Sequence, residues 1–168
     1  GTLPHEIESV TREVVRSVGR PVGVHFHNDA GLAVANSIAA VTAGARSVQG
    51  TMNGYGERCG NCDLTSFIPN LVLKMKMPCA AASALEHLTE VSRYVSEIAN
   101  LAHNERAPYV GDNAFAHKGG IHVSALKKDT STYEHLDPAL VGNRRKVLVS
   151  ELAGKSNIEL KARELGIE

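Results

Sequence analysis

The segment 22–27, VGVHFH, places valine or phenylalanine at every second position and glycine or histidine between them. A period of two predicts a β-strand, because successive side chains of a strand point to opposite faces. Such a strand turns its apolar side chains towards covering helices and projects His25 and His27 together from its other face. A second short strand is predicted at 46–50.

The stretches around these strands carry apolar residues at helical spacing. A first helix, capped by Thr2, is predicted to end at Gly19 and carries the stripe Ile7, Val10, Val14 and Val18. A second helix is predicted at 31–43, and strand, helix, strand within about thirty residues predicts a parallel crossover unit. Asp63 is predicted to cap a third helix, which Pro69 kinks. This rhythm is typical of an α/β barrel.

The pattern changes after Pro78. Ser83 and Glu86 form a possible capping box for a long helix. Its stripe would be Leu85, Leu88, Val91, Val95, Ile98 and Leu101. The predicted organisation is therefore part of an α/β barrel at 1–77, followed by a mostly helical region at 78–168.

Composition narrows the class of protein. The 168 residues carry 18 Lys and Arg against 18 Asp and Glu, and this balance argues against a nucleic-acid partner. No apolar run is long enough to cross a membrane. The three cysteines cannot form a disulfide framework, so a cytoplasmic protein is expected.

Two imidazoles on one strand face, near the carboxyl end of the strand, can bind one divalent ion. The glycine-rich loop after the second strand adds Asn61, whose amide oxygen can reach the same ion. Histidines that only form hydrogen bonds inside a polar barrel fit the spacing equally well, so the residues alone leave both readings open. A hard cation would also want a carboxylate. Asn28 and Asp29 are predicted to cap the next helix.

The segments VHFHNDAGLAVANS and GTMNGYGERCGNCDL together resemble the second half of the barrel of the isopropylmalate, citramalate and homocitrate synthase family. NAFAHKGGIHVSAL is similar to the segment that follows the barrel in that family, and YEHLDPALVGNRRKVLVSELAGKSNI is most similar to its citramalate synthases. The resemblance covers the whole chain. It implies a partial TIM (β/α)8 barrel, namely the last two strands with their helices at 1–77, followed by a mostly helical accessory subdomain at 78–168.

The resemblance implies a metal-assisted Claisen condensation between acetyl-CoA and a 2-oxo acid. Pyruvate is the favoured acceptor, with 2-oxoisovalerate as the alternative. The implied metal ligands are His25, His27 and Asn61, for magnesium, manganese or zinc. The implied catalytic residues are Glu57 and His122, and the implied substrate or CoA contacts are Asn53, Gly54, Gly56 and Tyr133.

Family members lend the segment around His122 to the neighbouring subunit, which implies a homodimer. The family's Arg and Asp of the first strand and its glutamate of a middle strand have no counterpart in this chain, so the chain alone is expected to be incomplete. Alternatives are a related metal-dependent barrel lyase or hydrolase, or a non-catalytic module that dimerises through the helix at 83–103. His117 is expected to be structural, and His103 to lie at the surface.

Overall fold

The computed structural model describes residues 1–117 and 134–147, together with residues 162 and 166. His122 and Tyr133 lie outside the described residues. The α-helices are α1 (Pro4–Val18), α2 (Ala33–Thr42), α3 (Leu64–Pro69) and α4 (Leu88–Ile98). The strands are β1 (Gly23–His25), β2 (Ser47–Gln49), β3 (Ala116–His117) and β4 (Lys146–Val147). Short helical turns lie at Met52–Gly54, Asn70–Lys74, Ala82–His87 and Pro138–Val141.

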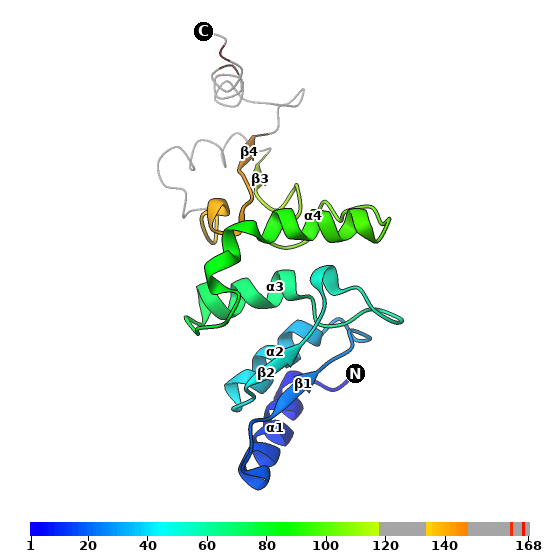
Figure 1. The fold of residues 1–168 in the computed structure, drawn as a ribbon, viewed down its shortest axis with the longest axis vertical. Helices are drawn as coiled ribbons and strands as arrows, with labels where there is room; N and C mark the ends of the chain where they lie inside the picture. The colour runs from blue at the N-terminus through cyan, green and yellow to red at the C-terminus, as the bar shows by residue number, and fades with distance from the viewer. Residues whose placement is uncertain (118–133, 148–161, 163–165, 167–168) are drawn as a thin grey trace.

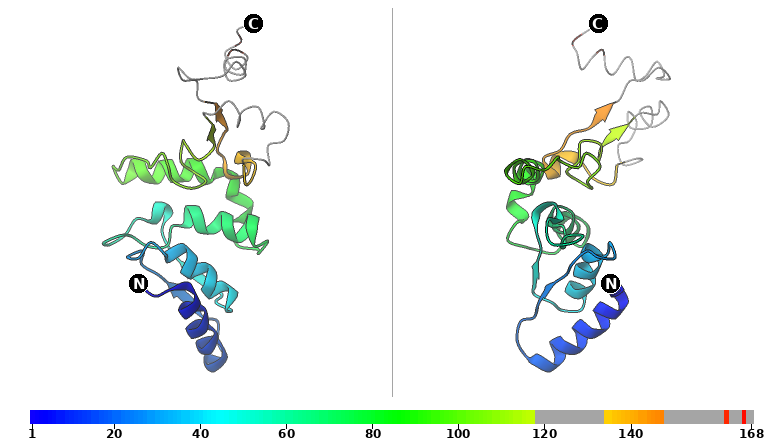
Figure 2. Two further views of the ribbon diagram at one scale, coloured as in Figure 1. Left: turned by 180° about the vertical axis from the view of Figure 1, so that it is seen from behind. Right: turned by 90° about the vertical axis from the view of Figure 1, so that its right-hand side faces the viewer.

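The predicted crossover unit is present. Strands β1 and β2 pair in parallel, with Val24 opposite Val48 and His25 opposite Gln49, and α2 connects them. Figures 1 and 2 show this unit and α1 at one end of the molecule, with α3 between it and α4. The alternation of β1 also holds, since Val24 is half-buried while His25 is exposed.

One hydrophobic cluster joins the two predicted parts of the chain. It contains Phe67 and Leu71 from the region of α3, and Leu88, Val110 and Phe115 from the part after Pro78. Val110 and Phe115 are at most 2 % exposed, so this cluster is a true core. The accessory region is therefore packed onto the strand-containing region.

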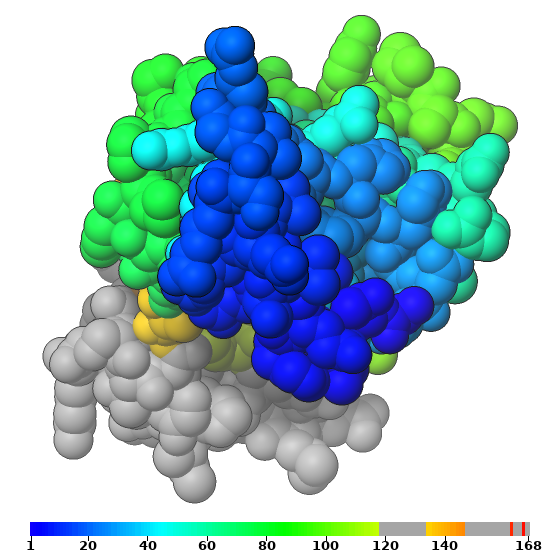
Figure 3. All heavy atoms as spheres, turned by 90° about the horizontal axis from the view of Figure 1, so that it is seen from below, coloured from blue at the N-terminus to red at the C-terminus, as the bar shows by residue number. Residues whose placement is uncertain are grey.

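The helices differ from the prediction in which faces they bury. The first helix is capped by Glu6, whose carboxylate accepts from the Leu3 amide, rather than by Thr2. Its stripe of Val10, Val14 and Val18 is 38–58 % exposed. Figure 3 shows α1, in dark blue, on the outer surface of this end. Two strands are too few to cover the whole helix, which in a closed barrel packs across neighbouring strands.

The predicted capping box at Ser83 does not form. The α-helix begins at Leu88, and Ser83 lies inside the preceding 3-10 turn, where its side chain cannot cap a first turn. The buried face of α4 consists of Leu88, Thr89, Ser92 and Ser96. Ile98 of the predicted stripe is instead 70 % exposed. The predicted stripe is thus buried at its start, by Leu85 and Leu88, while the small polar residues Ser92 and Ser96 face the rest of the protein further along α4.

A buried ion cluster lies beside the short parallel pair β3–β4. The Glu134 carboxylate is 2 % exposed, accepts from Arg145 Nε at 2.6 Å and lies 3.0 Å from His117 Nε2. Hydrogen bonding to Arg145 holds the pKa of Glu134 below its usual value. This cluster gives His117 the structural role expected from the sequence.

Replacing Glu134 by glutamine should lower the free energy of unfolding by about 1–2 kcal/mol at pH 7, because Arg145 and His117 lose a charged partner. The lowered pKa means that the stabilisation is present above about pH 4.3 and disappears as the pH falls through the folded-state pKa. Urea unfolding at pH 7 and pH 3 measures both effects. The exposed Glu13→Gln is the matched control, and an equal loss in E134Q at both pH values would contradict the prediction.

Candidate metal and ligand site

The two histidines of the candidate site lie side by side. Their ring centroids are 5.1 Å apart and their planes meet at 76°, an edge-to-face arrangement. His25 ends β1, and His27 lies two residues further on. Both side chains are on the exposed face of the strand, as the period of two predicts. The rings are thus close enough to act on one ligand.

The glycine-rich loop brings Asn61 directly opposite His27. These two residues form an isolated antiparallel bridge. The Cys62 amide donates to the Phe26 carbonyl at 3.0 Å, and the Asn28 amide donates to the Gly60 carbonyl at 2.8 Å. Directly opposed residues of an antiparallel pair have Cβ atoms about 5 Å apart. Backbone pairing therefore places an amide side chain beside the second imidazole.

The Asn61 side-chain oxygen is buried and has no hydrogen-bond partner among the residues that the structure describes. A buried polar atom without a partner is unfavourable and calls for an explanation, such as a bound ion. An amide oxygen beside an imidazole suits a divalent cation with mixed nitrogen and oxygen ligands. The donor atoms present therefore fit the metal that the sequence predicts.

The described residues do not complete such a site. Within them, no cluster of three His, Cys, Asp or Glu side chains is arranged to hold a metal ion. Asp63 follows Asn61 closely, but its carboxylate caps α3 by accepting from the Thr65 amide at 2.8 Å. This cap is the predicted one, and burial raises the pKa of Asp63. The described residues therefore offer two imidazoles and an amide oxygen, with no carboxylate arranged beside them.

Glycines are required where the loop folds onto Asn61. A Cβ on Gly56 would lie 2.7 Å from Asn61 Nδ2, and one on Gly60 would lie 2.0 Å from the Gly54 carbonyl oxygen. Gly60 and Gly54 also have φ values of +87° and +67°. The glycines thus let two stretches of the loop backbone approach each other closely, and they leave room for the side-chain amide of Asn61.

An ion pair ties this loop to the residues after His27. Arg58 binds both carboxylate oxygens of Asp29, through Nε at 2.7 Å and through its terminal nitrogen at 2.9 Å. These bonds lower the pKa of Asp29 to about 2, so it stays ionised at neutral pH. The cap expected from Asp29 comes from Asn28 alone, whose side-chain oxygen accepts from the Ala33 amide at 3.1 Å.

Two further residues of the predicted site lie apart from this contact. The Glu57 side chain is 85 % exposed, with its carboxylate 3.9 Å from Arg58. The Asn53 amide bonds to Ser92 and Ser96 of α4. These serines were not predicted as site residues, although their spacing of four residues on a predicted helix puts them on one face. The expectation that His103 lies at the surface is wrong, because it is half-buried and lies 3.0 Å from Ser92 Oγ.

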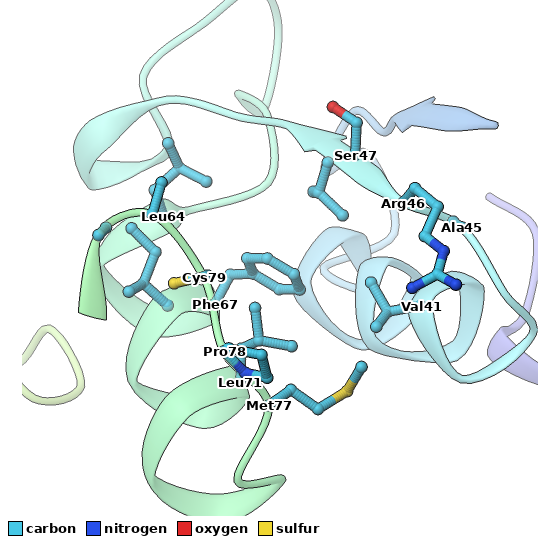
Figure 4. A pocket seen from close by; sticks show the side chains of 14 residues that line it. Val41, Ala45, Arg46, Ser47, Leu64, Phe67, Leu71, Met77, Pro78 and Cys79 are labelled. Carbon is cyan, nitrogen blue, oxygen red and sulfur yellow. The ribbon is translucent and has the colours of Figure 1, made fainter. Parts of the chain in front are cut away.

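A separate hollow of about 430 Å³ opens between α2, β2 and α3, as Figure 4 shows. Phe67, Leu71 and Met77 give it an apolar wall, and Arg46 lies at its edge. None of the residues that line it belongs to the predicted site. The hollow therefore adds nothing to the histidine pair.

Replacing Gly56 by alanine should weaken Mn²⁺ binding about tenfold, because the new methyl group displaces the Asn61 side chain. Binding is measured by electron paramagnetic resonance of free Mn²⁺. Gly23→Ala is the control, since its Cβ meets nothing closer than 3.5 Å. Equal Mn²⁺ affinity for G56A and G23A would refute the role given to Gly56.

Comparison with known proteins places this geometry in a family. Residues 1–95 match the family model described as HMGL-like, and residues 109–168 match the one described as homocitrate synthase post-HMGL domain-like. An (R)-citramalate synthase of Synechocystis sp. is 55 % identical over 99 % of this chain, and one of Geobacter sulfurreducens is 54 % identical over all of it. A homocitrate synthase of Pyrococcus horikoshii is 42 % identical over 99 % of the chain and 45 % of its own length.

The chain spans 32 % of the length of each of the two citramalate synthases. Among solved structures, an HMG-CoA lyase from Acinetobacter baumannii, in complex with coenzyme A and 3-methylmalate, superposes with a TM-score of 0.51. That match covers 61 % of this chain and 35 % of the lyase, at 23 % identity. The predicted partial barrel is thereby confirmed as the fold.

Proposed function

The chain belongs to the HMGL-like family, together with citramalate, 2-isopropylmalate and homocitrate synthases, and on that premise we propose that it forms part of an acyltransferase. The proposed reaction condenses acetyl-CoA with a 2-oxo acid. Pyruvate, which gives citramalate, is favoured over 2-oxoisovalerate because the citramalate synthases reach 55 % identity and the 2-isopropylmalate synthase 44 %. The observation that carries the proposal is the Asn61 oxygen opposite His27, which has no hydrogen-bond partner within the described part of the chain.

His25, His27 and Asn61 would hold the divalent ion. When bound, such an ion polarises the keto group of the 2-oxo acid towards attack by the acetyl carbon. Imidazole nitrogen is compatible with zinc, while the amide oxygen and an additional carboxylate favour magnesium or manganese. A cytoplasmic location fits this chemistry, and Cys59, Cys62 and Cys79 are all free thiols.

The chain's own residues have distinct proposed tasks. Gly54 and Gly56 have no side chains to block access, so substrate or CoA can approach the loop backbone closely. The exposed Glu57 carboxylate is the proposed polar catalytic group of this loop. His122 is proposed for acid–base work and Tyr133 for contact with the acyl-CoA, both acting in the neighbouring site of a homodimer.

The part of the chain that the structure describes contains no helix long and apolar enough to span a membrane. A lyase of the same fold and a non-catalytic dimerisation module are the competing functions. The lyase would cleave a hydroxyacyl-CoA, and the module would bind no ion at the histidines. A hydrolase is a third alternative, distinguished by its lack of dependence on acetyl-CoA.

The test uses a full-length protein that carries this chain. Pyruvate, acetyl-CoA and Mn²⁺ should yield free CoA, detected with a thiol reagent, and citramalate, detected by mass spectrometry. His27→Gln should lower Mn²⁺ affinity and turnover by about 100-fold, whereas the exposed His5→Gln should change neither. Absence of citramalate, or H27Q with normal Mn²⁺ affinity, would overturn the proposal.

The isolated 168-residue chain should bind Mn²⁺ more weakly than the full-length protein and show no synthase activity, because the carboxylate ligand is missing from its described residues. The same thiol assay and the same resonance titration measure both properties. Turnover of pyruvate and acetyl-CoA by the isolated chain would contradict this expectation.

A further inference from the structure

We propose that helix α4 positions the metal-binding loop through Asn53, which makes Asn53 a positioning residue rather than one that touches substrate. The inference rests on the proposed function, because it concerns the loop that carries Asn61. It assigns to the accessory region a direct influence on the candidate site.

Both polar atoms of the Asn53 side chain are engaged by one turn of α4. Its Nδ2 donates to the Ser92 carbonyl at 2.8 Å and to Ser96 Oγ at 3.1 Å. Its Oδ1 accepts from Ser92 Oγ at 2.5 Å. Three bonds to residues four apart on one helix fix the loop in both position and rotation. The side chain has little hydrogen-bonding capacity left for a substrate.

The two serines of this contact are buried, and the contact extends on both sides to half-buried side chains. Ser92 is fully buried and Ser96 is 2 % exposed. The Tyr55 hydroxyl lies 3.0 Å from Ser96 Oγ, and His103 Nε2 lies 3.0 Å from Ser92 Oγ. Since Ser92 Oγ gives its only proton to Asn53, it accepts one from His103. Breaking this network in part is unfavourable, because a broken bond leaves a buried serine group unpaired.

The network leads directly to the candidate site through the backbone. Asn53 has a φ of +61° and the next residue, Gly54, has one of +67°. This double left-handed turn aims the Gly54 carbonyl at the backbone N–H of Asn61, which donates to it at 3.0 Å. Asn61 in turn faces His27. A shift of Asn53 against α4 therefore moves the backbone of Asn61, and with it the side-chain amide, relative to the imidazoles.

The loop has little room to compensate for such a shift by rearranging its own backbone. A Cβ on Gly60 would lie 2.0 Å from the Gly54 carbonyl oxygen, so these two backbones are already at closest approach. The far side of the loop is held by the bonds from Arg58 to Asp29. Together with the backbone bonds that pair Asn61 with His27, the position of Asn53 sets where the Asn61 side chain lies.

The test compares Asn53→Gly, Ser92→Ala and the double variant in the full-length protein. Glycine adopts a φ of +61° without strain, so N53G removes the amide and keeps the turn. Alanine keeps the helix and the backbone carbonyl, so S92A removes only the hydroxyl. Glu97→Ala, on the exposed face of the same helix, is the control.

Three quantities are measured at a temperature well below unfolding: Mn²⁺ affinity by electron paramagnetic resonance, amide hydrogen exchange of residues 51–63, and KM for acetyl-CoA and pyruvate. N53G and S92A should each weaken Mn²⁺ binding by about 3- to 10-fold, less than is usual for a residue bonded to a ligand itself. Exchange in the loop should quicken in both variants. The double variant should lose little more than either single one, because both act through one contact.

Unchanged Mn²⁺ affinity in N53G and S92A would overturn the inference, even if their melting temperatures fell. An increase in KM confined to N53G, with S92A like the wild type, would overturn it as well, because Asn53 would then touch substrate. If the wild-type protein bound no Mn²⁺, the proposed function would fail and this inference with it. Failure of the variants alone leaves the proposed function intact.

Discussion

The antiparallel contact between His27 and Asn61 is the feature on which the candidate site depends. Strand β1 pairs in parallel with β2 up to His25, and the loop after β2 then returns beside its extension. Two backbone hydrogen bonds, one on each side of His27, fix that return. Without them the imidazoles would still project from the strand, but no oxygen donor would stand opposite them.

Everything else in the loop serves to keep that contact in place. Glycines permit the close approach, the Arg58–Asp29 ion pair holds one edge, and α4 holds the other through Asn53. The three restraints differ in kind: steric, ionic and hydrogen-bonded. The ion pair is exposed to solvent, and it is the restraint that salt screens.

The accessory region is more than an appendage to the barrel. It shares one hydrophobic cluster with α3 and offers a row of buried serines to the loop. Small polar residues on that helix face bring the backbones close and specify one rotation, which a stripe of leucines would not do. The exposed Tyr94 and Ile98 on the other side of α4, and the valines of α1, leave apolar surface free.

The sequence by itself determined most of the local elements, and its resemblance to a family supplied the residues proposed for the candidate site. The alternation of apolar and polar residues at 22–27 predicted a strand with both imidazoles on one face, and Asp63 was predicted to cap α3. Both predictions succeeded because they depend on residues that are close in the sequence. The start of α4 and its buried face were decided by tertiary packing, which favoured Ser92 and Ser96 over the apolar stripe. The partners of Asp29 and Asn53 were likewise beyond sequence reasoning, since they lie 29 and 39 residues away and meet only when the loop folds back.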